Sequence, residues 1–167
     1  EGALRLNLMR VLRELAMGVA QLRSGRFLHA SAIAVEGRAL VITGPRQAGK
    51  TSLLTYLLAN SPAQFLCNDR VLVKWYDGSI RLHGMPTIVS LRDGTLDLFP
   101  GMRQSIENQR FTTRATLAEA CASRALPQLP PKEGRHSLSP HQYCSLLDCA
   151  PVQAATGAAL LFPRQTG

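Results

Sequence analysis

The residues most able to do chemistry in this sequence form one glycine-rich stretch, GPRQAGKT, at positions 44–51. It fits the pattern Gly-x-x-x-x-Gly-Lys-Thr, in which glycines let the backbone curl so that successive N–H groups point into one hollow and hold phosphate oxygens. In that arrangement Lys50 reaches the outer phosphates of a nucleotide, and the Thr51 hydroxyl ligates Mg²⁺. The stretch therefore predicts a site for a nucleoside triphosphate, with ATP and Mg²⁺ as the expected ligands.

The surroundings of this stretch favour the same interpretation. The apolar run at 39–42 is typical of a strand covered on both faces, and residues 51–58 have helical spacing. A ligand-free glycine turn would leave Lys50 at the positive end of a helix, where the dipole disfavours a cation; a bound anion removes that objection. We expect the nucleotide to contact Gly44, Pro45, Arg46, Gln47, Ala48, Gly49, Lys50, Thr51 and Ser52.

Phosphoryl transfer also needs a carboxylate, either as a metal ligand or as a base. Asp69 fits best, because it directly follows the apolar stretch at 65–67 and so stands at the end of an expected strand. The alternative is that Asn68 and Asp69 only form a turn. Three other acidic residues fit less well, since they fall in expected turns or helices: Asp93, Asp97 and Glu107.

Composition bounds the class of protein. The chain has 167 residues, 46% of them hydrophobic, and a formal net charge of +8. This predicts one globular domain over 1–167, cut from a longer chain since it begins with Glu1, and no apolar run approaches the ~20 residues of a membrane span. The basic residues are scattered, and only 5% of residues are aromatic, which argues against nucleic acid as the partner.

Cysteines give little evidence for a metal centre. A zinc site built from His136, His141, Cys144 and Cys149 matches no standard ligand spacing. We therefore expect ordinary reduced thiols, as in a cytoplasmic protein.

The coarse order of elements follows from hydrophobic periodicity and turn residues. Residues 4–22 predict an amphipathic helix that packs its apolar face on the core, and Asp77-Gly78 predicts a hairpin turn. Residues 128–139, rich in Pro, Gly and charge, predict a mobile loop or linker. Further helices are expected over 116–122 and 139–147, and strands over 27–35, 38–43, 64–67, 71–76, 80–82, 87–91 and 158–162.

The ordered set of a histidine strand, a phosphate loop and an acidic pair resembles the catalytic domain of HPr kinase/phosphorylase and its relatives of undefined substrate. The residues that carry the resemblance are His29-Ala30-Ser31-Ala32, the loop at 44–51, the run LCNDRV at 66–71 and the run RLHGMP at 81–86. They lie within residues 27–102, a little under half of the chain. The phosphate loop alone is common to many folds, so the order of the set is the specific part.

This resemblance implies an α/β P-loop domain of the HPr kinase and phosphoenolpyruvate-carboxykinase-like type, with a mixed sheet and flanking helices. It implies transfer of the γ-phosphoryl group of ATP to a hydroxyl on an unidentified protein or small molecule, with Lys50, His29 and Asp69 near the reacting atoms and Thr51 and Asp69 on Mg²⁺. It also implies oligomers, for which the first helix offers a surface.

The sequence departs from the family at five positions. Asn68 stands where the family often has the first acid of the pair, and Arg81 and His83 replace a Glu and an Arg. Arg46 and Gln47 make the phosphate loop bulkier. Two functions therefore stay open: an ATP-dependent kinase, and a nucleotide-binding module with little catalysis that regulates a partner protein.

Overall fold

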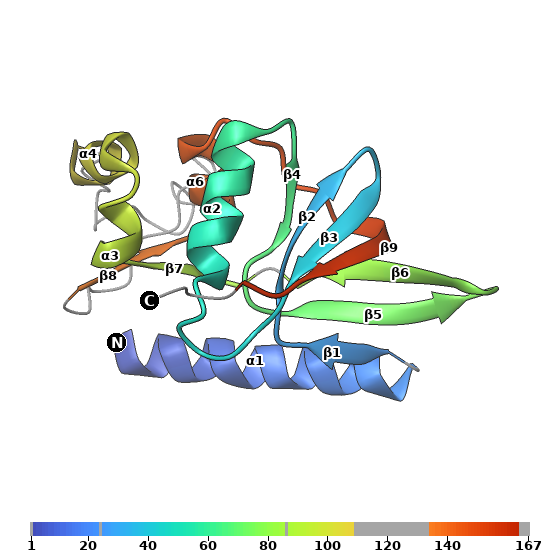
Figure 1. Cartoon of the computed structure of the whole chain (residues 1–167). Coiled ribbons are helices and arrows are strands. Elements are labelled where there is room, and N and C mark those ends of the chain that lie inside the picture. Colours follow the sequence, from blue (N-terminus) through green and yellow to red (C-terminus); the bar gives the residue numbers. More distant parts are fainter. Residues whose placement is uncertain (1, 24, 86, 109–133, 164–167) are drawn as a thin grey trace.

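The computed structural model describes residues 2–23, 25–85, 87–108 and 134–163 as a mixed α/β structure with flanking helices (Figure 1). The expected helix over 116–122 lies outside the described residues. The helices are α1 (Gly2–Leu22), α2 (Lys50–Asn60), α3 (Asp93–Leu96), α4 (Pro100–Asn108) and α6 (Pro140–Leu146). The strands are β1 (Arg26–Leu28), β2 (Ser31–Val35), β3 (Arg38–Ile42), β4 (Gln64–Cys67), β5 (Val71–Tyr76), β6 (Ser79–Gly84), β7 (Val89–Arg92), β8 (Arg135–Leu138) and β9 (Ala154–Leu161).

Seven strands form one sheet in the order β1-β5-β6-β9-β3-β2-β4. Every neighbouring pair is antiparallel except β3 and β9, which run in parallel with Ile42 beside Leu161. Parallel partners end at the same edge of a sheet. The residues that follow β3 therefore lie beside the residues that follow β9.

The sheet curls because alanines line its inner face. Along β2, Ala32 and Ala34 lie in one core cluster with Val41, Val73 and Leu82, whereas Ile33 points to the other face and joins α2. Small side chains let the two halves of the sheet approach closely. As a result β4 contacts β6, although three strands separate them in the sheet order.

The other face of the sheet carries the main core. Leu54 and Leu58 of α2 are buried there against Phe65, and the paired strands β7 and β8 add Leu91 and Leu138. Because side chains alternate between the two faces of a strand, the other side chains of β7 and β8 point away from this core. This core therefore holds α2 and the β7–β8 pair in fixed positions.

The prediction for the first helix is right about its existence and wrong about its packing. Leu8, Leu15 and Leu22 share a face that points away from the body, and together with Val11, Leu12 and Val19 they are 51–87% exposed. The opposite side, with buried Met17, lies against the sheet near β1 and β5 (Figure 1). Periodicity shows which residues share a face of a helix, but it does not show what that face contacts.

The predicted loop over 128–139 is also partly wrong. Residues 128–133 lie outside the described residues, but Arg135–Leu138 form strand β8 paired with β7. Leu138 is fully buried, so tertiary packing overrides the loop-like composition. The hairpin at Asp77-Gly78 is confirmed, and the strands β4 and β5 have the predicted bounds.

The curl makes Gly84 a sensitive position. A Cβ atom at Gly84 would overlap the carbonyl oxygen of Leu66 on β4, which is rigid backbone. We expect Gly84→Ala to lower the free energy of unfolding by about 3 kcal/mol, as measured by chemical denaturation. Gly101→Ala is the control, because a Cβ at Gly101 meets nothing within 4 Å, and its stability should change by less than about 1 kcal/mol. Equal stability of the two variants would contradict the curled arrangement.

Candidate functional site

The glycine-rich stretch forms the turn between β3 and α2. Gly49 has a left-handed backbone (φ 82°), as does Gln47 (φ 71°), so the chain reverses sharply before the helix. Gly49 is the N-cap of α2, and no side chain caps the helix. The first N–H groups of α2 have no partner within the helix and face the turn. They offer hydrogen bonds and the positive end of the helix dipole to an anion.

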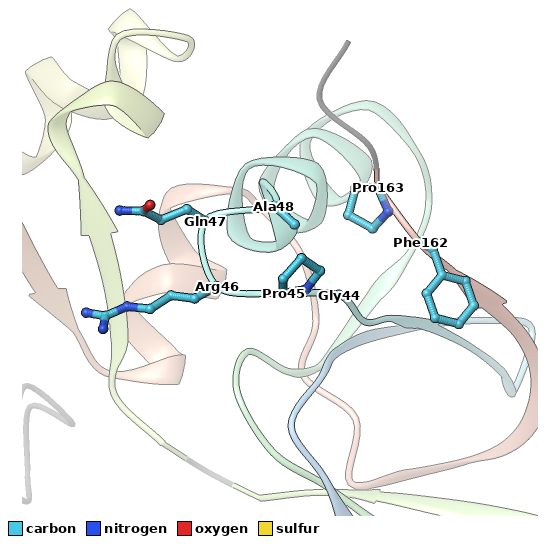
Figure 2. Close-up of a pocket in the computed structure, with 7 residues that line it drawn as sticks. All are labelled: Gly44, Pro45, Arg46, Gln47, Ala48, Phe162 and Pro163. Carbon is cyan, nitrogen blue, oxygen red and sulfur yellow. The ribbon is translucent and has the colours of Figure 1, made fainter. Parts of the chain in front are cut away.

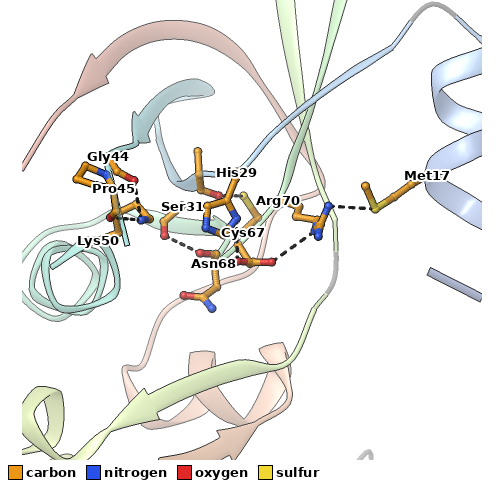
Figure 3. A network of polar contacts seen from close by, with 11 residues as sticks. Met17, His29, Ser31, Gly44, Pro45, Lys50, Cys67, Asn68 and Arg70 are labelled. Atoms are coloured by element: carbon orange, nitrogen blue, oxygen red, sulfur yellow. Dashed lines mark hydrogen bonds and ion pairs between the residues drawn. The ribbon is translucent and has the colours of Figure 1, made fainter. Parts of the chain in front are cut away.

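Lys50 lies across this turn. Its ammonium donates hydrogen bonds to the carbonyl oxygens of Gly44 and Pro45, both at 2.9 Å (Figure 3). These bonds use carbonyl oxygens and not the N–H groups of the turn, of which the Ala48 N–H donates to Pro45 at 3.3 Å. The loop is therefore closed by its own lysine, with a positive charge held above it.

A cleft of about 890 Å³ opens beside the loop and contains the chemically active side chains that the sequence singled out. Lys50 and Thr51 line it from the start of α2, and His29 and Asp69 line it from the ends of β1 and β4. The Thr51 hydroxyl makes no hydrogen bond to any described residue, whereas the Ser52 hydroxyl pairs with Thr95 of α3 at 3.1 Å. His29 and Asp69, which are 40 positions apart in the sequence, thus line the same cleft.

Asp69 is held in place from several sides. One carboxylate oxygen lies 3.1 Å from His29 Nδ1, and the other lies 3.5 Å from Arg70 Nε. The Asp69 carbonyl accepts the Ala30 N–H at 3.1 Å. The neighbouring Asn68 carbonyl accepts the buried Ser31 hydroxyl at 2.6 Å (Figure 3). These contacts position a carboxylate and an imidazole together, which is an arrangement able to accept and hold a proton.

Three oxygen donors in the cleft suit a hard cation. They are the Thr51 hydroxyl, the Asp69 carboxylate and the Asn68 side-chain oxygen, which is buried and has no hydrogen-bond partner among the described residues. Mg²⁺ prefers oxygen ligands and keeps several waters, so one carboxylate with neutral oxygens is a fitting set. Within the described residues no three His, Cys, Asp or Glu side chains gather in a group that could hold a metal ion.

Cys67 lies directly before this pair but does not belong to the chemistry. It is buried, and its thiol lies 3.6 Å from the Ala30 carbonyl oxygen. Burial raises the pKa of Cys67 to about 12, so the thiol stays protonated at neutral pH. Two of the three other acids considered from sequence are engaged elsewhere: Asp93 and Asp97 pair with Arg103.

A second hollow of about 680 Å³ lies on the other side of the loop. Phe162 and Pro163, which follow β9, form one wall, and Pro45 and Ala48 form the other (Figure 2). Figure 2 shows the side chains of Arg46 and Gln47 extending together away from Phe162. The loop therefore separates a polar cleft from a hollow with an exposed aromatic ring.

Several cleft residues were missed by the sequence analysis. Ser90 and Arg92 of β7 and Arg135 of β8 line the cleft opposite the loop. They come together only through the pairing of β7 with β8, whose second strand was expected to be a loop. The excess of positive charge of the chain was visible in the sequence, but its concentration at Arg92 and Arg135 was not.

Comparison with known proteins yields a distant likeness of fold. Neither a protein-family model nor a curated protein matches the sequence. Among solved structures, the HPr(Ser) kinase/phosphatase from Coxiella burnetii is similar with a TM-score of 0.41 and 14% sequence identity. The match covers 85% of this chain and 63% of that one, so the chain spans less than two thirds of its neighbour. In the described part of the chain, no helix is both long and apolar enough to cross a membrane.

A buried pair of hydroxyls links α2 to α6. Thr55 of α2 donates to the Thr51 carbonyl at 2.8 Å, so its proton is used, and the Tyr143 hydroxyl donates to Thr55 at 2.8 Å. Burial raises the pKa of Tyr143 well above its ordinary value, which keeps this donor protonated. The ring of Tyr143 also packs edge-on against Phe65 at 5.5 Å.

This pair generates a prediction about stability. Tyr143→Phe keeps the ring but removes the donor, and we expect the free energy of unfolding to fall by about 1 kcal/mol. Tyr56→Phe is the matched control, since Tyr56 lies on α2 next to Thr55 but is 56% exposed, and it should leave stability unchanged. Chemical denaturation of both variants measures the difference. A Tyr143→Phe protein as stable as the parent would show that the hydroxyl pair does not hold α2.

Proposed function

We propose that this chain binds ATP with Mg²⁺ and transfers the γ-phosphoryl group to a hydroxyl on a protein or small-molecule acceptor. The observation that carries the proposal is the convergence in one cleft of Lys50 and Thr51, at the start of α2, with His29 and Asp69. Backbone amides at a helix N-terminus can hold phosphates, and a carboxylate beside them can accept a proton; phosphoryl transfer needs both.

Binding of the nucleotide uses both sides of the loop. The phosphates lie on the loop amides with Lys50 beside the outer phosphates, because this is where the donors and positive charge are. The base lies in the hollow with Phe162, whose exposed ring offers a stacking surface next to two prolines. Thr51 and Asn68 are the residues that would hold Mg²⁺, with Asp69 as a third oxygen ligand if it is not the base; the ion neutralises charge on the phosphates when bound.

In the transfer step one proton and one phosphoryl group move. The acceptor oxygen forms a bond to the γ-phosphorus, while the bond from that phosphorus to the β–γ bridging oxygen breaks and ADP leaves. Asp69 takes the hydroxyl proton, and His29, 3.1 Å away, stabilises or relays it. Lys50 stays near the phosphate oxygens and compensates the charge that moves to ADP.

The second candidate is a nucleotide-binding module with weak or no catalysis that regulates a partner protein. It is favoured by the contacts of Asp69, whose two carboxylate oxygens are already engaged by His29 and Arg70. It is also favoured by Asn68, a neutral residue beside that acid. The same loop and hollow would then bind ATP without an efficient base. Cytoplasmic location and homo-oligomer formation belong to both proposals.

Lys50→Ala tests nucleotide binding. The variant loses a charged donor to the phosphates and the two bonds that close the loop, so we expect ATP to bind about 100-fold more weakly, as measured by calorimetry with Mg²⁺ present. Lys74→Ala is the control, because Lys74 lies on β5 and does not line the cleft. Near-normal ATP affinity in the Lys50 variant would contradict the proposed site.

Asp69→Asn separates the two candidate functions. If Asp69 is the base, the variant should lose transfer by about 100-fold or more while ATP affinity stays within a few-fold of the parent. The assay follows label from γ-labelled ATP into one acceptor in an extract of the source organism.

Asp97→Asn serves as the control, because Asp97 is an acid outside the cleft. Loss of ATP binding together with transfer would assign Asp69 to the metal or to structure instead. A parent protein that binds ATP but labels nothing would favour the regulatory module.

A further inference from the structure

The side of the cleft opposite the phosphate loop carries two arginines on adjacent strands. In the β7–β8 pair, Arg92 is the direct partner of Arg135, and Ser90 is the direct partner of Ser137. Directly opposed residues share a face of an antiparallel pair. Val89 and its partner Leu138 are fully buried on the core side, so alternation places the arginines and serines on the opposite face. We call Ser90, Arg92, Arg135 and Ser137 the arginine patch.

The arginine patch is electrostatically unfavourable as it stands. Like charges directly opposite each other destabilise a strand pair. Within the described residues neither Arg92 nor Arg135 forms an ion pair or a side-chain hydrogen bond. Asp93 follows Arg92 directly in the sequence, but its carboxylate is engaged by Arg103 at 3.5 Å and His136 at 3.1 Å. An anion lying between the two arginines would remove the repulsion and use both guanidinium forks.

The position of the patch distinguishes this anion from the nucleotide. Arg92 and Arg135 line the same cleft as Lys50, but from a separate two-stranded sheet that faces the loop. The loop amides, Lys50 and Mg²⁺ already neutralise most of the charge of a bound triphosphate. The patch therefore adds cations where the phosphoryl group must depart toward its acceptor, since attacking and leaving oxygens lie roughly in line.

We infer that the arginine patch binds an anionic group of the acceptor, so that the substrate is a hydroxyl compound carrying a phosphate or a carboxylate. That the acceptor has a hydroxyl rests on the proposed function. That it has an anionic group rests on the arginine patch alone. The two guanidinium groups hold the anionic group, and this places the hydroxyl between the loop and Asp69. Either anion presents the oxygens that a guanidinium fork recognises.

Titration of anions into nucleotide-loaded protein tests this inference. The protein is saturated with Mg²⁺ and a non-hydrolysable ATP analogue, and inorganic phosphate and malonate are titrated in parallel by calorimetry. We expect at least one of them to bind, and Arg92→Gln or Arg135→Gln to weaken that binding at least tenfold. The stronger of the two probes shows whether the acceptor group is phosphate-like or carboxylate-like. Arg38→Gln, on β3 and outside the cleft, is the matched control and should bind as the parent does.

Two further readouts exclude other roles for the arginines. The affinity for the ATP analogue should be unchanged in both patch variants. If a patch variant binds the analogue more weakly but binds ADP as the parent does, the arginines contact the γ-phosphate. That result would overturn the assignment to the acceptor. Melting temperatures should stay equal or rise, because each substitution removes a like-charge contact; Arg92→Lys should bind the anion with intermediate affinity. Anion binding that is unaffected by either glutamine variant, or absent from the parent, would overturn the inference.

Failure of the nucleotide site can be recognised separately. In the Lys50→Ala protein without nucleotide, the patch should still bind the same probe, and Arg92→Gln added to that variant should weaken it. If the parent binds no ATP but this dependence on Arg92 persists, the proposed kinase is wrong and the anion site stands. If ATP binds but anion binding does not depend on Arg92, the kinase proposal stands and the assignment of the patch to the acceptor fails.

Discussion

The turn between β3 and α2 is the constraint on which the rest of the site depends. A buried strand and a packed helix fix both of its ends, and Gly49 supplies the backbone conformation that joins them. Lys50 then closes the turn by bonding to the carbonyls of Gly44 and Pro45. Because Lys50 occupies carbonyl oxygens and not N–H groups, the lysine and the N-terminal amides of α2 together give the turn positive potential on the side of the cleft.

The other elements matter for what they bring to this turn. Parallel pairing of β3 with β9 sets Phe162 on one side of it, and the ends of β1 and β4 set His29 and Asp69 on the other. The β7–β8 pair closes the cleft with Arg92 and Arg135. The nucleotide that we propose as ligand, with an aromatic base and a charged phosphate tail, would suit this separation of an apolar hollow from a polar cleft.

Local signals in the sequence were enough for the loop and for most strands. The turn chemistry of Asp77-Gly78 and the apolar run of β4 depend on neighbouring residues only, so their bounds were predicted well. The packing of α1 and the existence of β8 depend on distant partners, and both predictions failed. The arginine patch was missed for the same reason, since opposition of Arg92 to Arg135 is a matter of register between strands 43 positions apart. His29 and Asp69 were linked beforehand only through the family resemblance.

The hydroxyl pair of Thr55 and Tyr143 has a mechanical consequence for the cleft. Tyr143 belongs to α6, which follows β8 after a single residue, Ser139, whose side chain caps the helix. The wall that carries Arg135 is thereby fastened, through the core, to the same helix that begins with Lys50. Movement of one side of the cleft against the other would therefore have to break this buried hydrogen bond and the core packing around it. The hydroxyl pair thus opposes opening of the cleft, and selectivity between ligands would then depend on how well each one fits the existing gap.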